Sequence, residues 1–552
     1  MSPAATGPGW VRRVAYLVAL AVVAAACGGG DASGDSSAGG GAENEGTPTA
    51  GGRLVYGLEA ETTDGWCLPE SQLAVSGIMV AGTIYDTLTR PNAEGGYDPW
   101  LAESVEPNDD YSVWTIGLRE GVTFHDGSEL TAEVVKNNLD AYRGEYPARH
   151  PLLTTFIFDN IESVEVVDPL NVSVTMREPW VAFDAYLFGG GRNGMLAQEQ
   201  LDDTESCAED LVGTGPFVLK EWIPNQRLVA ERNPDYWASD ADGNQLPYLD
   251  EIEFRPIVEV TQRINALQTG EIDAMHTSNP ESVAELRRQA EADEVDVTES
   301  VDFGEVAYTM LNSSKAPFDS ILARQAVAHA VDFEEYNAIR GRDILTHANG
   351  PFAPGNVGNL DDTGFPTFDL EKAEDLVAQY EDETGEPLRF SYTTTQVEAD
   401  VATAQLLKEQ WEAAGMEVEI VTVDQSTQID TAISGDFQAI DWQNHPGGDP
   451  DREYVWWQST YPTNFGRIHD EEIDRLLAEG RVTADAGERQ RIYEDLNRRF
   501  AEQVYNVWIY YPVWSVGTAT DVHGVMGQGP DGGEPFPGLA TGHPVETLWV
   551  ER

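Results

Sequence analysis

Basic residues are scarce in this sequence. Its 552 residues include 33 lysines and arginines against 96 aspartates and glutamates, which gives a formal net charge of −63. Nucleic-acid binding needs clustered lysines and arginines on the phosphates, so this balance excludes DNA or RNA as a partner. With 41% hydrophobic residues and 14 tryptophans, the chain is too apolar for a disordered acidic polymer, and we expect a folded body with its charge spread over the surface.

Cysteine is also rare, with three residues and no Cys-x-x-Cys spacing, which excludes zinc ribbons and thioredoxin-like redox motifs. No two of the nine histidines are spaced i, i+4 on a plausible helix, so we expect neither a bound metal nor a cofactor. None of the five lysines follows a glycine, which excludes a P-loop. A secreted hydrolase stays a distant alternative, because the sequence has no Gly-x-Ser-x-Gly elbow and no His-Glu-x-x-His helix.

Long hydrophobic runs are absent except at the N-terminus. Arg12 and Arg13 precede thirteen apolar residues, 14–26, too few to cross a hydrocarbon layer of about 30 Å, so residues 1–26 are predicted to be a secretory signal peptide. The small residues before Cys27 resemble the lipobox of bacterial lipoproteins, which implies lipid attachment at Cys27. An ordinary signal peptide cut elsewhere is the alternative.

A segment rich in glycine, serine and acidic residues follows, and its composition predicts a flexible tether over 27–52. We therefore expect a body held at the outer face of the bacterial cell membrane by a lipid anchor, or a periplasmic protein. If Cys27 carries the lipid, Cys67 and Cys207 are the two cysteines left in that oxidising setting. A disulfide between them would close a long loop and stabilise the fold by about 3–5 kcal/mol, while two unpaired buried thiols are the alternative.

The clearest structural pattern lies in residues 388–442. Strands are expected over 388–393, 416–423 and 437–442, with helices over 399–414 and 426–434 between them, the first ended by Gly415. Strands alternating with helices predict βαβ units and a parallel sheet. Ligands of such sheets bind beyond the carboxyl ends of the strands, which is where Trp442 and the loop 443–451 stand.

Earlier in the chain, "RLVYGL" predicts a strand over 53–58. Alternating apolar and polar residues over 111–124, around Arg119-Glu120-Gly121, predict a β-hairpin, and Thr131 is placed to cap a helix that runs through residue 142.

Ten segments in order along the chain carry a resemblance to a known family. They read "GGRLVYGL", "IYDTLTR", "LAESVEPNDDYSVWTIGLREGVTFHDGSELTAEVV", "VGTGPFVLKEW", "RNPDYW", "INALQTGEIDAM", "NSSKAPFDSILARQAVAHAVD", "LKEQWEAAGMEVEI", "GDPDREYVWW" and "HDEEIDRLLAEGR". Together they resemble the extracellular solute-binding proteins of ABC transporters, family 5, the peptide/nickel class. The resemblance spans about residues 51–520, nearly the whole body after the tether.

This resemblance implies an α/β fold with two lobes, as in type II periplasmic binding proteins of the large class with an extra subdomain. Lobe I is expected over 53–303 and 510–552, with the extra subdomain at about 92–208. Lobe II is expected over 304–509. In this family the solute is enclosed between the closing lobes, and the closed form docks on a separate permease with its ATPase.

The resemblance therefore implies a monomeric receptor, not an enzyme, that binds a peptide-like solute. In peptide-binding members, an aspartate two residues before the Gly-Asp-Pro-Asp string pairs with the α-ammonium of the ligand, and here that position is Pro446. An oligosaccharide or another non-peptide solute is thus an alternative, and a tethered sensor or chaperone that feeds no permease is another.

The candidate ligand-binding residues are Glu59, Trp66, Trp442, Gln443, Asn444 and His445. Packing or surface roles are the alternative for Glu59 and Trp66, and Trp442 has the alternative of a core position under the loop. Asp441 is expected on the opposite face of its strand from Trp442. Asp449 and Asp451 are expected to cap the loop rather than to bind the ligand.

Overall fold

The computed structural model describes residues 46–62, 65–151, 153–444, 447–527 and 533–551. The expected signal peptide, Cys27 and the first part of the expected tether lie outside these residues. Among the described helices, none combines the length and the apolar composition needed to cross a membrane.

A seven-stranded sheet is built around the first strand, β1 (Arg53–Leu58), which lies between two parallel neighbours, β10 and β11. Its order is β12-β19-β11-β1-β10-β9-β8. The other strands are β8 (Phe217–Ile223), β9 (Arg227–Arg232), β10 (Glu251–Pro256), β11 (Ala274–Thr277), β12 (Asp296–Ser300) and β19 (Trp514–Thr518). The residues of β1 after Arg53 are all buried, because helices cover both faces of this sheet.

Three helices cover the seven-stranded sheet: α1 (Val75–Ile84), α6 (Val260–Gln268) and α7 (Pro280–Ala290). Side chains of α6 and α7 pack with Val55 and Met275 in one cluster, and α1 packs with Leu54 and Tyr56 in another. Neighbouring residues of β1 thus face opposite layers, as the alternation of side chains along a strand requires.

A four-stranded antiparallel sheet lies within residues 92–208, in the order β4 (Ala102–Pro107), β5 (Val113–Leu118), β7 (Asn171–Met176) and β6 (Ile161–Asp168). Helix α2 (Ala132–Tyr142) packs on it, and Thr131 Oγ1 accepts a hydrogen bond from Val134 N at 3.4 Å, which confirms the predicted cap. The same region holds β3 (Tyr97–Pro99), which pairs with β2 (Thr89–Pro91) just before it, and also α3 (Thr154–Ile157), α4 (Phe183–Phe188), the 3-10 turn η1 (Gly189–Gly191) and α5 (Gln198–Asp202).

The predicted hairpin over 111–124 is wrong. Strand β5 is formed, but its partners are β4 before it and β7, which lies more than fifty residues later. Beyond Gly121 the chain forms only an isolated bridge between Thr123 and Glu129. The alternation of side chains identified a half-buried strand correctly, but it carries no information about which strand lies beside it.

A six-stranded sheet has the order β14-β18-β13-β17-β15-β16. Its strands are β13 (Ala307–Leu311), β14 (Thr346–His347), β15 (Arg389–Thr395), β16 (Glu417–Val423), β17 (Ala439–Gln443) and β18 (Asn506–Tyr511). Strand β15 runs parallel to both β16 and β17, which confirms the predicted βαβ units. The two predicted helices are α11 (Glu398–Ala413) and α12 (Gln425–Ser434), followed by Gly415 and Gly435 at positive φ, the conformation that ends helices at glycine.

Further helices surround the six-stranded sheet: α8 (Ile321–His329), α9 (Phe333–Tyr336) with the π-helical turn η2 (Asn337–Gly341), α10 (Leu370–Thr384), η3 (Pro450–Glu453), α13 (Tyr454–Trp457), α14 (Glu471–Val482) and α15 (Ala486–Gln503). Trp411 of α11 is fully buried and meets Phe390 and Tyr392 of β15 edge to face, with ring centroids 5.3 and 5.2 Å apart. This contact fixes α11 against its sheet.

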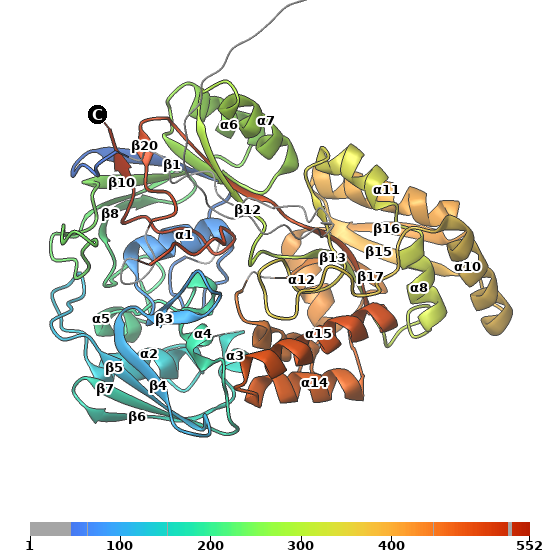
Figure 1. Ribbon diagram of the computed structural model, residues 1–552, viewed down its shortest axis with the longest axis horizontal. Coiled ribbons are helices and arrows are strands. Elements are labelled where there is room, and N and C mark those ends of the chain that lie inside the picture. Colours follow the sequence, from blue (N-terminus) through green and yellow to red (C-terminus); the bar gives the residue numbers. More distant parts are fainter. Residues whose placement is uncertain (1–45, 63–64, 152, 445–446, 528–532, 552) are drawn as a thin grey trace, which may run out of the picture. The chain divides into compact units, whose positions relative to one another are not determined.

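The chain has two separate main cores. One is formed by residues up to Ala274 and after Trp514, and the other lies entirely between Val306 and Tyr511. We call the part built on the seven- and four-stranded sheets the first lobe, and the part built on the six-stranded sheet the second lobe. The chain passes between them after β12 and again after β18 (Figure 1), so β18 extends two residues past the expected boundary at 509/510.

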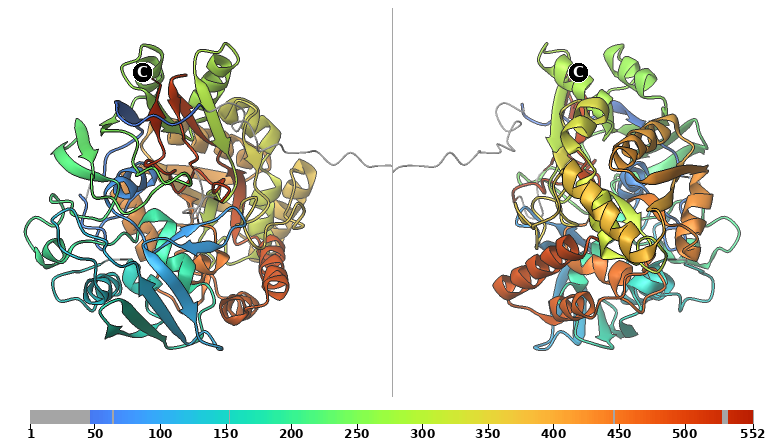
Figure 2. Two further views of the ribbon diagram at one scale, coloured as in Figure 1. Left: turned by 60° about the vertical axis from the view of Figure 1, so that its left-hand side comes forward. Right: turned by 90° about the vertical axis from the view of Figure 1, so that its right-hand side faces the viewer.

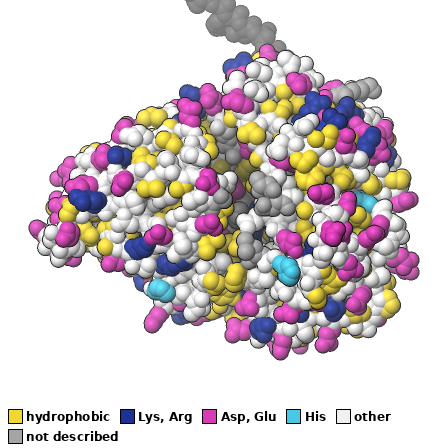
Figure 3. Space-filling view, turned by 180° about the vertical axis from the view of Figure 1, so that it is seen from behind, with side chains coloured by type: hydrophobic (Ala, Val, Ile, Leu, Met, Phe, Trp, Pro, Cys, Tyr) yellow, Lys and Arg dark blue, Asp and Glu magenta, His cyan; other side chains and the backbone are white. Residues whose placement is uncertain are grey.

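The four-stranded sheet of the first lobe and helices α14 and α15 of the second lobe lie at the same end of the body in both Figure 1 and Figure 2. A backbone hydrogen bond from Val181 N to Arg481 O, 3.0 Å long, joins the two lobes there. On the face shown in Figure 3, aspartate and glutamate side chains are scattered rather than gathered in one patch, as the composition predicted.

Candidate functional site

A small cavity of about 20 Å³ lies in the second lobe beside the carboxyl end of β17. Its lining residues are Gly304, Val306, Pro351, Phe352, Asn356, Asn444, Gly447, Asp449, Pro450, Arg452 and Glu453. The loop that follows β17 supplies more than half of them. The cavity is therefore where the parallel-sheet rule placed a ligand site.

Asn444 is held on the cavity wall by three hydrogen bonds. Its backbone N–H donates to Val306 O at 3.1 Å, the hydroxyl of Tyr308 donates to Oδ1 at 2.7 Å, and Nδ2 donates to Glu453 Oε2 at 3.1 Å. The amide thus links a tyrosine of β13 to a carboxylate that lines the cavity. Its fixed orientation makes it a positioned part of the wall.

Two glutamates that the sequence analysis missed stand at this site. Burial raises the pKa of Glu453 to about 8, although the nearby charge of Arg452 opposes the shift. Burial also raises the pKa of Glu305 to about 7, although the side-chain amide of Gln443 donates to its carboxylate. A carboxylate with a raised pKa lacks a sufficient positive partner, so both groups would be stabilised in their charged form by a cation. The only sequence signal for Glu453 was its place just after the Gly-Asp-Pro-Asp string.

Glu59 lies in the first lobe, immediately after β1. Its Oε1 accepts hydrogen bonds from Thr277 Oγ1 at 2.7 Å and from Arg263 Nη2 at 3.1 Å. Burial raises its pKa despite the opposing charge of Arg263, and its own negative charge helps to raise the pKa of Glu305 in the second lobe. Glu59 thus bonds to residues of its own lobe, and it is not among the residues that line the cavity.

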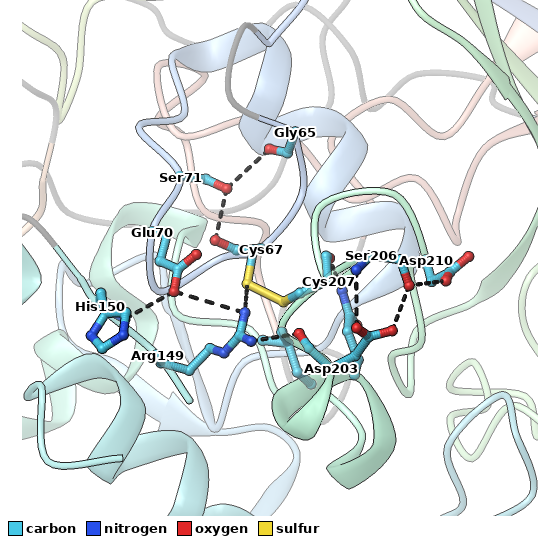
Figure 4. Close-up of a disulfide and its surroundings, with 12 residues drawn as sticks. Gly65, Cys67, Glu70, Ser71, Arg149, His150, Asp203, Ser206, Cys207 and Asp210 are labelled. Atoms are coloured by element: carbon cyan, nitrogen blue, oxygen red, sulfur yellow. Dashed lines mark hydrogen bonds and ion pairs between the residues drawn. A yellow bond between two sulfur atoms is a disulfide. The ribbon is translucent and has the colours of Figure 1, made fainter. Parts of the chain in front are cut away.

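Trp66 is not part of this group. It is 1% exposed, belongs to the first-lobe core and meets Trp222 edge to face with ring centroids 5.9 Å apart. Its neighbour Cys67 forms a disulfide with Cys207, and the two Cα atoms are 5.2 Å apart (Figure 4). These contacts give Trp66 a packing role, which is the alternative that the sequence left open.

Trp442 and Asp441, adjacent on β17, make different contacts. The Trp442 ring is half-buried and lies edge to face with Phe465 at 5.8 Å, against the second-lobe core. Asp441 instead accepts a hydrogen bond from Thr394 Oγ1 of β15 at 3.5 Å. Of the predicted residues at this strand end, Asn444 lines the cavity and Gln443 donates to Glu305, whereas Trp442 is not among the lining residues. His445 and Pro446 lie outside the described residues.

We expect Asp441→Asn to stabilise the protein at neutral pH. Burial, followed by the charge of Asp400, raises the pKa of Asp441 to about 7, well above the value of about 3.9 in an unfolded chain. The folded protein therefore keeps a proton that the unfolded chain loses, so stability falls as the pH rises from about 4 to 7. At pH 8 the variant should exceed wild type by about 1–3 kcal/mol, with no difference at pH 4.

Urea unfolding at the two pH values measures this effect. The matched control is Asp436→Asn, because Asp436 is exposed and pairs only at the surface with Lys315. Its effect should be the same at both pH values. A stability difference for Asp441→Asn that does not change with pH would contradict the expectation.

Asp449 caps the short helix η3, as predicted: its Oδ1 accepts from Asp451 N at 2.8 Å, and it also pairs with Arg489 at 2.6 Å. Asp451 does more than the predicted capping. It is fully buried and accepts hydrogen bonds from Trp180 Nε1 at 2.6 Å and Tyr186 Oη at 3.0 Å, both in the first lobe. The Gly-Asp-Pro-Asp string therefore carries a contact between the lobes.

Within the described ranges, no group of three or more histidine, cysteine, aspartate or glutamate side chains is arranged to hold a metal ion. The site is instead defined by carboxylates, arginines, an amide and aromatic rings. This arrangement suits reversible binding of a polar solute.

Comparisons with known proteins agree with this fold. The model of the bacterial extracellular solute-binding proteins, family 5 (middle region), matches residues 96–466. A glutathione-binding protein, GsiB of Escherichia coli O1:K1, is 26% identical over 436 residues, which cover 75% of this chain and 80% of that protein.

Two solved structures are similar over 91% of this chain and 99% of their own. One is the periplasmic binding protein DppA from Helicobacter pylori in complex with the peptide STSA, with a TM-score of 0.77 and 22% identity. The other is the binding protein AgaA of A. tumefaciens R10 in complex with agropinic acid, with a TM-score of 0.77 and 23% identity. These likenesses confirm the two-lobed α/β fold predicted from the sequence.

Proposed function

Because the chain belongs to the bacterial extracellular solute-binding proteins of family 5, with the type II fold of periplasmic binding proteins, we propose that it is a membrane-tethered receptor of an ABC importer. It binds a peptide-like solute between its two lobes and delivers it to a permease and an ATPase on separate chains. It is a binding protein and not an enzyme, as its relatives are.

The position of Glu305 and Glu453 in and beside the cavity carries the proposal of a peptide-like solute, and their raised pKa values support it. These carboxylates lie in and beside the cavity, and burial has removed much of their hydration. An α-ammonium group would replace that hydration with an ion pair, whereas a neutral sugar would supply only dipoles. The carboxylate expected at position 446 thus has two substitutes elsewhere in the same site.

The mechanism is closure of the two lobes around the solute. A solute that contacts Glu59 on the first lobe and Trp442, Gln443, Asn444 and His445 on the second binds the closed state more tightly than the open one. Moving lobes from 1:99 to 99:1 in favour of closure needs about 5.5 kcal/mol of differential affinity. Main-chain hydrogen bonds and aromatic contacts of a short peptide can provide energies of this size. Trp66 packs in the core of the first lobe and does not touch the solute.

The tether follows from the same proposal. Lipid attached to Cys27 would hold the body at the outer face of the membrane, with residues 28–52 as a spacer, and the body itself would work as a monomer. This arrangement keeps the receptor close to its permease without restricting the movement of the lobes.

Native mass spectrometry of the purified protein tests the proposed solute. We expect peptide masses to be released on denaturation, and we expect the same peptides to raise the melting temperature of stripped protein by several degrees. Small-angle scattering should show smaller dimensions with the solute bound. Release of sugars would favour the oligosaccharide alternative, and unchanged dimensions at saturation would overturn lobe closure.

A further inference from the structure

Phe303 lies in the segment 301–306, which joins β12 of the first lobe to β13 of the second (Figure 1). Its φ is 52°, in the left-handed region that bulky residues rarely adopt. A backbone hydrogen bond from Phe303 N to the carbonyl oxygen of Pro354 in the second lobe, 2.9 Å long, holds this conformation. Backbone strain of this kind persists only where the surrounding structure maintains it, and it occurs often in segments that switch between states.

The ring of Phe303 is buried between one glycine from each lobe, and the residue is 5% exposed. A Cβ atom on Gly95, in the turn between β2 and β3 of the first lobe, would lie 3.0 Å from Phe303 Cε1. A Cβ atom on Gly355 of the second lobe would lie 3.0 Å from Phe303 Cε2. Both distances are shorter than ordinary van der Waals contacts, so glycine is what leaves room for the ring on each side. We call Gly95 and Gly355 the glycine seat.

Two further contacts show that the two lobes meet around this ring. Phe536 of the C-terminal segment packs on Phe303, with ring centroids 4.8 Å apart. The β2–β3 hairpin also reaches the second lobe a second time, because a Cβ atom on Gly448 would lie 2.8 Å from the hydroxyl oxygen of Tyr97. The ring is therefore enclosed by parts of the chain that belong to different cores.

We propose that Phe303 is a closure wedge, whose ring occupies the glycine seat when the lobes are closed and stabilises that state without any contribution from the solute. The inference rests on the proposed function, because it concerns the lobe closure described there, and it adds a residue outside the ligand-binding set. The wedge adjoins the candidate site, since Gly304, the next residue, lines the small cavity beside β17.

The physical basis is burial of the ring at a surface between two moving parts. When the lobes open, Gly95 and Gly355 separate, and the Phe303 ring becomes exposed to water. Burial of a phenylalanine side chain is favourable enough to shift a two-state equilibrium by about tenfold. A packed interior does not accept an added methyl group without displacement, so a side chain on either glycine would hold the lobes apart.

The test uses the full-length protein and the variants Gly355→Ala and Gly95→Ala. Small-angle scattering measures the radius of gyration, without solute and with a mixture of synthetic tripeptides, and thermal titration measures the affinity for the mixture. We expect both variants to have a larger radius of gyration than wild type in each condition. They should bind the tripeptides about tenfold more weakly.

Phe303→Ala distinguishes a wedge from an ordinary core residue. Alone, it should weaken tripeptide binding by about tenfold, because closure no longer buries the ring. In the double variant Phe303→Ala/Gly355→Ala the added methyl group meets no ring, so the affinity should equal that of Phe303→Ala alone. Losses that multiply in the double variant, or a lower melting temperature of Phe303→Ala with unchanged affinity, would overturn the wedge.

The matched controls are Gly127→Ala in the first lobe and Gly364→Ala in the second. Gly127 and Gly364 have φ of 82° and 77°, close to the 82° of the seat glycines, and an added Cβ on either meets no atom within 4 Å. These variants carry similar backbone strain without filling space, so they should change neither the radius of gyration nor the affinity.

The solute-free comparison decides the wedge independently of the solute. An equal radius of gyration for Gly355→Ala and Gly364→Ala without solute would overturn the wedge and leave the peptide receptor intact. If the tripeptides neither bind nor contract wild type, the proposed peptide receptor is overturned, while a larger solute-free radius of Gly355→Ala would still support the wedge.

Discussion

Asp451→Ala is expected to lower the free energy of unfolding by about 3–5 kcal/mol. The Asp451 carboxylate is fully buried, and Nε and Nη2 of Arg481 each lie 3.0 Å from one of its oxygens. Arg481 is itself only 4% exposed, so the variant leaves an uncompensated charge in the interior. Trp180 Nε1 and the hydroxyl of Tyr186 lose their acceptor as well. Urea unfolding at pH 7 measures the change.

The matched control is Glu472→Ala in the same lobe. Glu472 pairs with Arg475 at 2.6 Å, but both side chains are nearly half exposed, so the variant should change stability by less than about 0.5 kcal/mol. The double variant Asp451→Leu/Arg481→Met removes both charges together and should recover much of the loss. A loss in the free energy of unfolding below about 1 kcal/mol for Asp451→Ala would show that water replaces the carboxylate as hydrogen-bond partner of these groups.

The contact between Asp451 and the first lobe also affects lobe closure. Trp180 and Tyr186 belong to the first lobe and Asp451 to the second, so the hydrogen bonds between them exist only while these surfaces touch. Arg481 also stacks on the ring of Tyr454, with 3.7 Å from Cζ to the ring centroid. Part of the energy that stabilises closure therefore comes from a contact that involves no solute, and the solute has correspondingly less to supply.

The sequence predicted well those features that depend on local patterns. The βαβ units around β15 follow from the alternation of strand and helix and from glycines at the helix ends, and each of these signals lies within a few residues of the element it defines. The partner of β5 could not be predicted in this way, because β7 lies far along the chain and pairing depends on tertiary packing.

The candidate site was predicted only in part, for a related reason. The end of β17 was correctly placed beside the cavity, since the carboxyl ends of parallel strands define such sites. Glu305 and Glu453 were missed because nothing distinguishes them, in so acidic a chain, from surface charges. Their burial arises only in the folded chain, because Glu305 precedes β13 and Glu453 follows β17 far along the sequence.

Removal of the disulfide is the second change for which we expect a large effect. Cys67 and Cys207 are 140 residues apart, so the crosslink restricts a long segment of the unfolded chain, and its loss should cost about 3–5 kcal/mol. Cys67→Ala/Cys207→Ala is the variant of choice, because both sulfurs are buried and alanine introduces no polar atom. Urea unfolding of the variant and of wild type measures the difference.

Adding a reductant to both proteins is the control, because it should destabilise wild type by the same amount and leave the double variant unchanged. The crosslink joins the loop that carries Trp66 to the segment after α5, and Arg149 Nη1 donates to Cys67 Sγ at 2.7 Å beside it (Figure 4). If the loss were below about 1 kcal/mol, this packing alone would hold the loop. Because the disulfide lies wholly within the first lobe, the variant should retain its solute affinity at temperatures where it stays folded, which separates the stability of the lobe from the closure of the site.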